Sequence, residues 1–225
     1  WDSVDGIMSY YKDYFHLFDK IYSFDRDDSK KYGFIYQPDF YVSDATVPYA
    51  DCEYDMNFIG NLSNNVDVYN RPSILSYIAQ FSTAHHLNSF LYLKYSNHRS
   101  RLNRYFGIKN KYEKLVEAYC ENDFMHPEAM SLNEVEKKQQ NAKIIIDLSH
   151  ANRQGLTINA ITALAKGKKL ITTNKRIIDE PFYNPTNIFI LDEKHPHLDA
   201  AWLKTPPQPI DMSELRMDNW LKTVL

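Results

Sequence analysis

From residue 53 onward, short apolar runs alternate with segments whose apolar residues recur every three or four positions. The runs are apolar along their whole length, which is typical of strands buried on both faces of a parallel sheet. The segments between them predict helices that cover the sheet, so the pattern indicates an α/β fold with a Rossmann-like parallel sheet. The predicted strands cover 56–60, 89–94, 143–148, 170–173 and 187–191, and the predicted helices cover 72–81, 111–119, 131–141 and 157–166.

The first 50 residues have a different pattern and are dense in Tyr, Phe and Asp. They predict a helix over 6–18, a strand over 21–24, a short helix over 27–32 that Gly33 ends, and a strand over 34–36. A proline-rich link at 206–209 leads to a final helix over 218–225. We therefore expect a remnant of a second α/β domain at 1–50, a Rossmann-like domain at 53–205, and a linker and helix at 206–225 that return toward the first domain.

Composition narrows the class of protein. The chain has 225 residues, of which 44% are hydrophobic, and this excludes a disordered protein. A net charge of −3 offers no basic footprint for nucleic acid. No apolar run approaches the roughly 20 residues of a membrane span. Cys52 and Cys120 form no disulfide framework, which favours the reducing cytoplasm. Because the chain begins at Trp1 without Met, we expect a piece of a longer protein.

Three loops follow predicted strands, where parallel sheets bind their ligands. They cover 60–71, the residues after 94 and 149–157. In the third loop, Gln154, Gly155, Leu156 and Thr157 lead directly into a helix. Gly155 permits close backbone approach, and free N–H groups at the helix start can bind a phosphate. The pattern also fits a plain turn at Gly155 and a plain helix cap at Thr157, and both interpretations stay open.

Basic side chains near these loops are candidates for neutralising a diphosphate. They are Arg71, Lys94 and Arg153, and each can equally be a solvated surface residue. His150 lies just beyond a strand end and can bond a phosphate or a sugar hydroxyl. The pairs His85-His86 and His195-Pro-His197 lack further ligands at zinc spacing, so no metal site is expected.

The order of motifs along nearly the whole chain resembles bacterial glycosyltransferases of capsule and lipopolysaccharide biosynthesis. The motifs that resemble the family are Trp1-Asp2-Ser3, Phe18-Asp19-Lys20, Ser23-Phe24-Asp25, Asp28, Lys31-Tyr32-Gly33, Phe58-Ile59-Gly60, Ile144 to His150, Gln154-Gly155-Leu156-Thr157, Ala163-Leu164, Gly167 to Asn174, Phe182-Tyr183-Asn184, Asn187-Ile188 and Asn219-Trp220-Leu221.

The resemblance implies the GT-B architecture of two facing Rossmann-like domains, of which this chain has the nucleotide-sugar domain and the end of the acceptor domain. It implies a metal-independent, cytoplasmic enzyme that transfers a sugar from a nucleotide-sugar to a surface polysaccharide or lipid-linked saccharide. Peripheral association with the inner membrane stays open. The donor site implied lies at Gly155, Leu156 and Thr157, with the candidates Gly60, Arg71, Lys94, His150, Arg153 and Gln154. No catalytic residue is assigned, because a general base usually comes from the acceptor domain.

Two residues depart from the family pattern. Related members usually carry an Arg and a Glu where this chain has Asn159 and Thr162. A carboxylate near the second position commonly bonds the donor ribose in GT-B enzymes, so its loss puts the donor identity and the activity in question.

Three alternatives remain. The first is a non-catalytic nucleotide-sugar-binding or interaction domain, and the second is a sugar-nucleotide epimerase. The third is a metal-dependent GT-A glycosyltransferase, in which Asp25-Arg26-Asp27 acts as the metal-binding DxD motif. The 24 residues before that motif are too few for the nucleotide-binding half that GT-A proteins place there, and acids at this point also suit a helix start.

Overall fold

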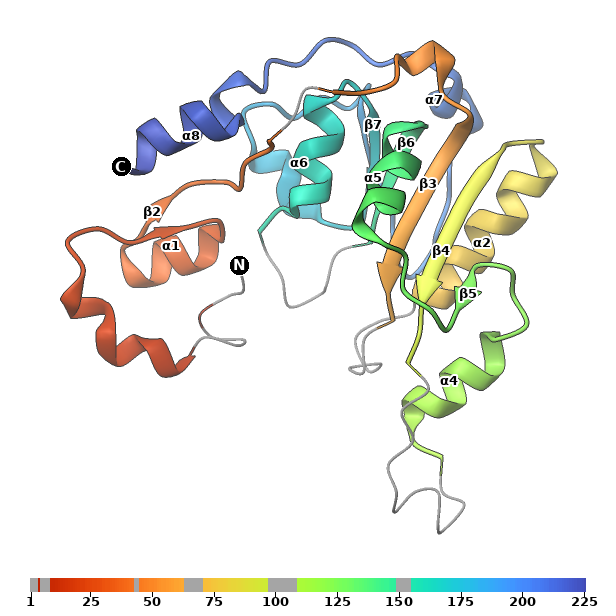
Figure 1. Ribbon diagram of the computed structural model, residues 1–225, viewed down its shortest axis with the longest axis horizontal. Coiled ribbons are helices and arrows are strands. Elements are labelled where there is room, and N and C mark those ends of the chain that lie inside the picture. The colour runs from red at the N-terminus through yellow and green to blue at the C-terminus, as the bar shows by residue number, and fades with distance from the viewer. Residues whose placement is uncertain (1–3, 5–8, 43–44, 63–70, 97–108, 149–154) are drawn as a thin grey trace. The chain divides into compact units, whose positions relative to one another are not determined.

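The computed structural model describes residues 4, 9–42, 45–62, 71–96, 109–148 and 155–225 (Figure 1). The chain forms two compact units, each built from separate stretches of sequence. The first unit contains Trp1–Ala45, Asp147–Ile190 and Thr205–Leu225, and the second contains Thr46–Ile146 and Leu191–Lys204.

Six strands form one sheet with the order β5-β4-β3-β6-β7-β8. The pairs β3–β4, β3–β6, β4–β5 and β7–β8 are parallel. The strand order reverses between β3 and β6, as it does in a doubly wound sheet. The predicted α/β, Rossmann-like parallel sheet is therefore confirmed. The strands are β3 (Tyr54–Asn61), β4 (Ser89–Lys94), β5 (Met125–His126), β6 (Ala142–Asp147), β7 (Lys169–Thr172) and β8 (Ile188–Ile190).

Helices alternate with these strands as predicted. The Ser131 side chain accepts a hydrogen bond from the Glu134 N–H, and the Glu134 side chain accepts one from the Ser131 N–H, which completes the predicted capping box of α5. In the second unit α2 contacts β4 and α5 contacts β3 (Figure 1). The helices are α2 (Arg71–Ala84), α4 (Lys111–Tyr119), α5 (Leu132–Gln140), α6 (Ile158–Ala165), α7 (Ala200–Lys204) and α8 (Met217–Val224), with short 3₁₀ helices η2 (Tyr49–Asp51), η3 (Lys175–Asp179) and η4 (Ser213–Leu215).

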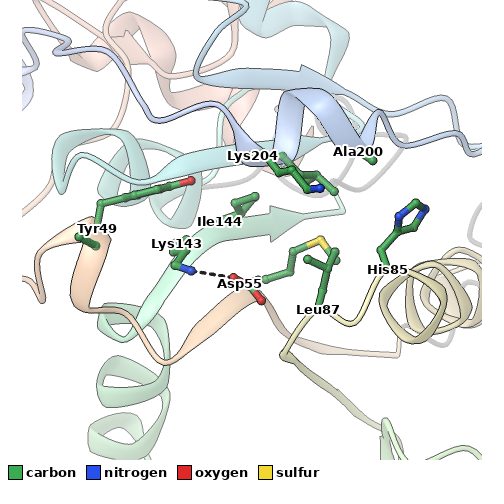
Figure 2. A pocket seen from close by; sticks show the side chains of 11 residues that line it. Tyr49, Asp55, His85, Leu87, Lys143, Ile144, Ala200 and Lys204 are labelled. Carbon is green, nitrogen blue, oxygen red and sulfur yellow. Dashed lines mark hydrogen bonds and ion pairs between the residues drawn. The ribbon is translucent and has the colours of Figure 1, made fainter.

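At the amino ends of β3 and β6, an ion pair joins the two strands. Lys143 Nζ lies 2.8 Å from Asp55 Oδ1, and both side chains are half-buried (Figure 2). This pair borders a cavity of the second unit that is described below.

The first unit contains the predicted strand–helix–strand segment. The strands β1 (Tyr22–Ser23) and β2 (Ile35–Tyr36) pair in parallel on either side of α1 (Arg26–Tyr32). Asp25 caps α1, and Gly33 ends it with a φ of 73°, a left-handed conformation that glycine adopts at low cost. The segment before β1 is a 3₁₀ helix, η1 (Ser9–Leu17), where an ordinary helix was expected. A 3₁₀ helix has three residues per turn. Phe15, near the end of η1, packs edge-on against Tyr32 and Phe34, and this packing holds η1 against the strand–helix–strand segment.

Within the first unit, the C-terminal segment is hydrogen-bonded to the residues that follow β2. Tyr41 donates its N–H to the Leu215 carbonyl at 3.0 Å, and its own carbonyl accepts from Met217 at 2.9 Å. Trp220 Nε1 of α8 donates to the Pro38 carbonyl at 2.7 Å. The core of this unit consists of Tyr41, Leu156, Ala160, Ile161, Leu164, Leu170, Ile177, Ile188, Met212 and Leu215.

None of the helices in the described residues combines the length and the apolar character that a bilayer crossing requires.

Candidate functional site

Three of the predicted donor residues gather in the second unit, at the carboxyl ends of β3 and β4. Gly60 stands opposite Leu93 in the register, and Asn61 stands opposite Lys94. Arg71, the first residue of α2, donates from Nη1 to the Asn61 carbonyl at 2.5 Å. The guanidinium of Arg71 therefore has a role within the protein, because it joins the last residue of β3 to the start of α2.

Gly155, Leu156 and Thr157 lie in the first unit, between β6 and α6. The Thr157 hydroxyl accepts a hydrogen bond from the Ala160 N–H at 3.1 Å and donates one to Asp147 Oδ1 at 3.0 Å. Thr157 is therefore the N-cap of α6, and Asp147 at the end of β6 fixes its orientation. The sequence indicated the cap but gave no sign that Asp147 holds it.

The space beside Gly155 is occupied by the protein itself. A β-carbon on residue 155 would stand 2.1 Å from Cδ2 of Phe24 and 2.7 Å from its carbonyl oxygen. The Gly155 carbonyl accepts from Asn174 Nδ2 at 3.1 Å, and Leu156 is only 4% exposed. The close approach that this glycine permits is therefore made by Phe24. His150, Arg153 and Gln154 lie outside the described residues.

The first turn of α6 has the properties of an anion site. Ile158 is 43% exposed and Asn159 is also exposed. The first turn carries no acidic side chain, and no described residue accepts a hydrogen bond from the backbone N–H of Ile158 or Asn159. Free N–H groups and the positive end of the helix dipole attract an anion to such a position.

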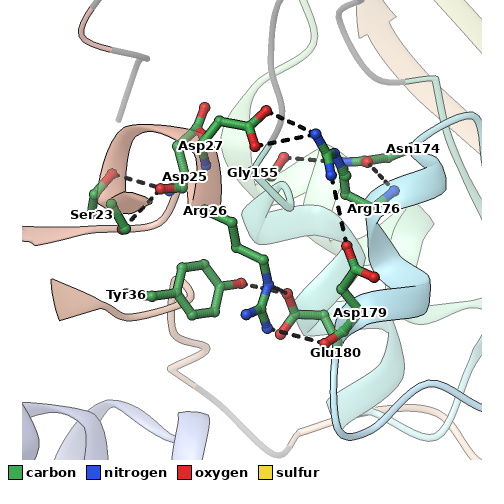
Figure 3. Close-up of polar contacts among 11 residues, drawn as sticks. Ser23, Asp25, Arg26, Asp27, Tyr36, Gly155, Asn174, Arg176, Asp179 and Glu180 are labelled. Carbon is green, nitrogen blue, oxygen red and sulfur yellow. Dashed lines mark hydrogen bonds and ion pairs between the residues drawn. The ribbon is translucent and has the colours of Figure 1, made fainter. Parts of the chain in front are cut away.

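The three carboxylates of the Asp25 to Asp28 segment all have partners in the first unit. Asp25 Oδ1 accepts from the N–H groups of Asp27 at 2.8 Å and Asp28 at 3.2 Å. The carboxylate of Asp27 pairs with Arg176 Nη2 at 2.9 and 3.1 Å (Figure 3). Asp28 accepts a hydrogen bond from the Val4 N–H at 2.7 Å. The DxD-like run thus caps a helix and forms an ion pair.

A second polar cluster in the same unit joins Arg26, Tyr36 and Glu180 (Figure 3). The Arg26 guanidinium lies over the Tyr36 ring at 3.8 Å, and its Nε is 3.0 Å from Glu180 Oε1. The Tyr36 hydroxyl donates to the same carboxylate oxygen. Burial, followed by this hydrogen bond, raises the pKa of Tyr36 above its ordinary value, so the hydroxyl stays a neutral donor and cannot serve as a base near neutral pH.

This cluster forms part of the wall of a cavity of about 660 Å³. Three acidic side chains line it against one basic side chain: Glu180, Asp211 and Glu214 against Arg26. Such a wall favours ligands that donate hydrogen bonds, such as hydroxyl or amine groups. Sequence reasoning missed the cluster, because residues 26 and 36 meet residue 180 only through the fold.

Within the described residues, no three His, Cys, Asp or Glu side chains are arranged to hold a metal ion. Compared with protein-family models and with curated proteins, the chain matches none.

Proposed function

We propose that this chain is the donor-binding part of a metal-independent, GT-B-type glycosyltransferase. The enzyme would transfer a sugar from a nucleotide-sugar to a bacterial surface polysaccharide or a lipid-linked saccharide precursor. The proposal combines the family resemblance of the sequence with one observation of the structure, the exposed first turn of α6 at the carboxyl end of β6.

In this proposal the donor diphosphate binds at the first turn of α6. The N–H groups of Ile158 and Asn159 donate to phosphate oxygens, and the helix dipole offsets part of the negative charge. These groups do what a divalent cation does in metal-dependent transferases, which is to stabilise the charge that develops on the leaving diphosphate. Asp147 and Thr157 position the helix start and need not touch the donor.

A charge placed in the first turn tests this site. Asn159→Glu adds a carboxylate at the second helical position, where it would repel a diphosphate. We expect calorimetric titration with UDP, GDP, CDP and TDP to show one preferred nucleotide, bound at least tenfold more weakly by this variant, which corresponds to about 1.4 kcal/mol or more.

Asn133→Glu is the matched control, because Asn133 holds the second position of α5 and is also exposed. Both substitutions place the same charge at the second position of a helix, so the control variant carries the same added charge away from α6. Equal affinity of the two variants would contradict a diphosphate site on α6.

A turnover assay separates a transferase from a binding domain and from an epimerase. A transferase releases free nucleotide from its donor only when an acceptor is present. A binding domain releases none, and an epimerase converts the donor sugar without releasing nucleotide. Because the acceptor domain supplies much of a GT-B active site, this assay belongs to the full-length protein.

A further inference from the structure

The second unit contains a cavity of about 430 Å³ at the amino ends of β3 and β6. Its volume lies in the range of small-molecule sites. Apolar side chains from three elements form much of its wall, among them Met56 of β3, Ile144 of β6 and Leu203 of α7. Ligands of a doubly wound sheet are expected at the carboxyl ends of its strands, so this cavity is separate from the proposed donor site.

Three polar groups of the cavity wall have no hydrogen-bond or ion-pair partner in the described part of the chain. Tyr49, His85 and Lys204 all line it (Figure 2). Within the described part of the chain, no hydrogen bond or ion pair involves the Tyr49 hydroxyl, the His85 ring nitrogens or the Lys204 ammonium. Other polar groups of the wall are already satisfied, since Lys143 and Asp55 pair with each other.

The charges of the lining select the sign of a ligand. The Lys143–Asp55 pair is neutral overall, which leaves the Lys204 ammonium as the uncompensated charge of the wall. His85 can donate a hydrogen bond from its ring, and it adds a second positive charge when protonated. Tyr49 is half-buried, and burial, with a smaller contribution from Asp55, raises its pKa to about 12, so its hydroxyl remains a donor. The three groups thus present donors and positive charge to an otherwise apolar space.

We propose that this cavity binds a small organic anion that has an apolar body. The anionic group would accept hydrogen bonds from Lys204, His85 and Tyr49, and the apolar body would pack against Met56, Ile144 and Leu203. This binding site goes beyond the proposed glycosyl transfer and does not depend on it.

Two anionic probes with an apolar body, and a neutral analogue of one of them, test the proposal. Phenylacetate and phenyl phosphate are the anionic probes, and phenylacetamide is the neutral analogue of the first. Ligand-observed NMR and calorimetry on the whole chain should show binding of at least one anion, with the amide bound at least tenfold more weakly. Equal binding of phenylacetate and phenylacetamide, or no binding of either anion, would overturn the proposal.

Variants then locate the site. Lys204→Gln should weaken binding of the anionic probe about tenfold or more, as loss of a charge-assisted contact does. Lys137→Gln removes an exposed lysine of α5 that does not line the cavity, and should leave the affinity unchanged. Ala200→Trp should fill the cavity and abolish binding. The far-UV circular dichroism spectrum of this variant shows whether the chain still folds. An affinity that neither Lys204→Gln nor a folded Ala200→Trp changes would place the probe elsewhere and refute the site.

Discussion

The ring of Phe24 lies where a side chain on residue 155 would stand, with its Cδ2 only 2.1 Å from the position of a β-carbon there. The two residues are far apart in sequence, yet this contact explains why the turn before α6 has a glycine. Packing of Phe24 thus joins the strand–helix–strand segment to the loop that starts α6, both within the first unit.

This contact predicts that Gly155→Ala destabilises the protein. The added methyl group must displace the Phe24 ring or the backbone, and overpacking of this kind costs about 1–3 kcal/mol. Chemical denaturation measures the loss. In a double-mutant cycle with Phe24→Ala, the alanine at 155 should cost less, because the ring that obstructs it is gone. An undiminished cost in the Phe24→Ala background would mean that the backbone, and not the ring, excludes the methyl group.

Asp25 caps α1 and is only 1% exposed, so we expect its substitutions to lower the free energy of unfolding to different degrees. Asp25→Ala removes the acceptor for the N–H groups of Asp27 and Asp28, and should lower the free energy of unfolding by about 0.5–2 kcal/mol. Asp25→Asn keeps an acceptor oxygen and should cost less. Thermal unfolding compares the two, with Ser131→Ala in the capping box of α5 as the reference for a lost cap. If the alanine and asparagine variants melt together, the cap is not what Asp25 contributes.

Replacing a buried asparagine by leucine should change stability in opposite directions at two positions of this chain. Asn57 on β3 is fully buried, and neither polar atom of its amide has a hydrogen-bond partner. Asn187 is 2% exposed, and its amide exchanges two hydrogen bonds with the backbone of Gln208, at 2.7 and 2.8 Å. Asn57→Leu should therefore be neutral or stabilise by about 1 kcal/mol, whereas Asn187→Leu should cost about 2 kcal/mol or more.

Urea denaturation of both leucine variants checks this pair. A clear loss of stability in Asn57→Leu, comparable to that in Asn187→Leu, would contradict an unpaired amide at Asn57. Because both residues are buried and the substitution is the same, differences in side-chain volume cancel to a first approximation.

Tyr36 predicts a loss of stability at alkaline pH. Its pKa is raised in the folded protein, by burial first and then by the hydrogen bond to Glu180. Above about pH 10 the unfolded chain therefore releases this proton while the folded chain keeps it, and rising pH favours unfolding. The free energy of unfolding should fall between pH 9 and pH 11 less steeply in Tyr36→Phe than in the unmodified chain. Parallel slopes in Tyr36→Phe and the unmodified chain would contradict the raised pKa.

The sequence predicted those features that depend on neighbours in the chain. The cap at Ser131 with Glu134, the stop at Gly33 and the strand over 89–94 are set by residues within a few positions, and each is confirmed. The two-residue strand β5 was missed because Met125–His126 forms no apolar run, and α7 was missed because five residues are too few to show a helical period.

The contacts that shape the candidate site could not be predicted from the sequence, because they join residues that are far apart in the chain. Arg176 meets Asp27 across 149 positions, and Arg26 meets Glu180 across 154. A surface arginine and a first-turn aspartate look the same in sequence whether or not the fold brings them together. The same limit applies to Arg71, whose bond to the Asn61 carbonyl gives it a structural role and leaves its predicted contact with a diphosphate a prediction.

The last prediction concerns metal ions. If helix N–H groups and the helix dipole take the place of a cation, nucleotide binding should have the same affinity with and without EDTA, and turnover of the full-length enzyme should persist.

The carboxylate of Asp27 faces Arg176, so Asp27→Asn should weaken that ion pair and shift the melting temperature slightly, because half-exposed pairs contribute at most about 1 kcal/mol. The affinity for nucleotide should not change. Calorimetry with EDTA, Mn²⁺ or Mg²⁺ on both proteins decides the matter. Binding that requires the cation and disappears in Asp27→Asn would establish the GT-A alternative, and it would remove the diphosphate from the first turn of α6.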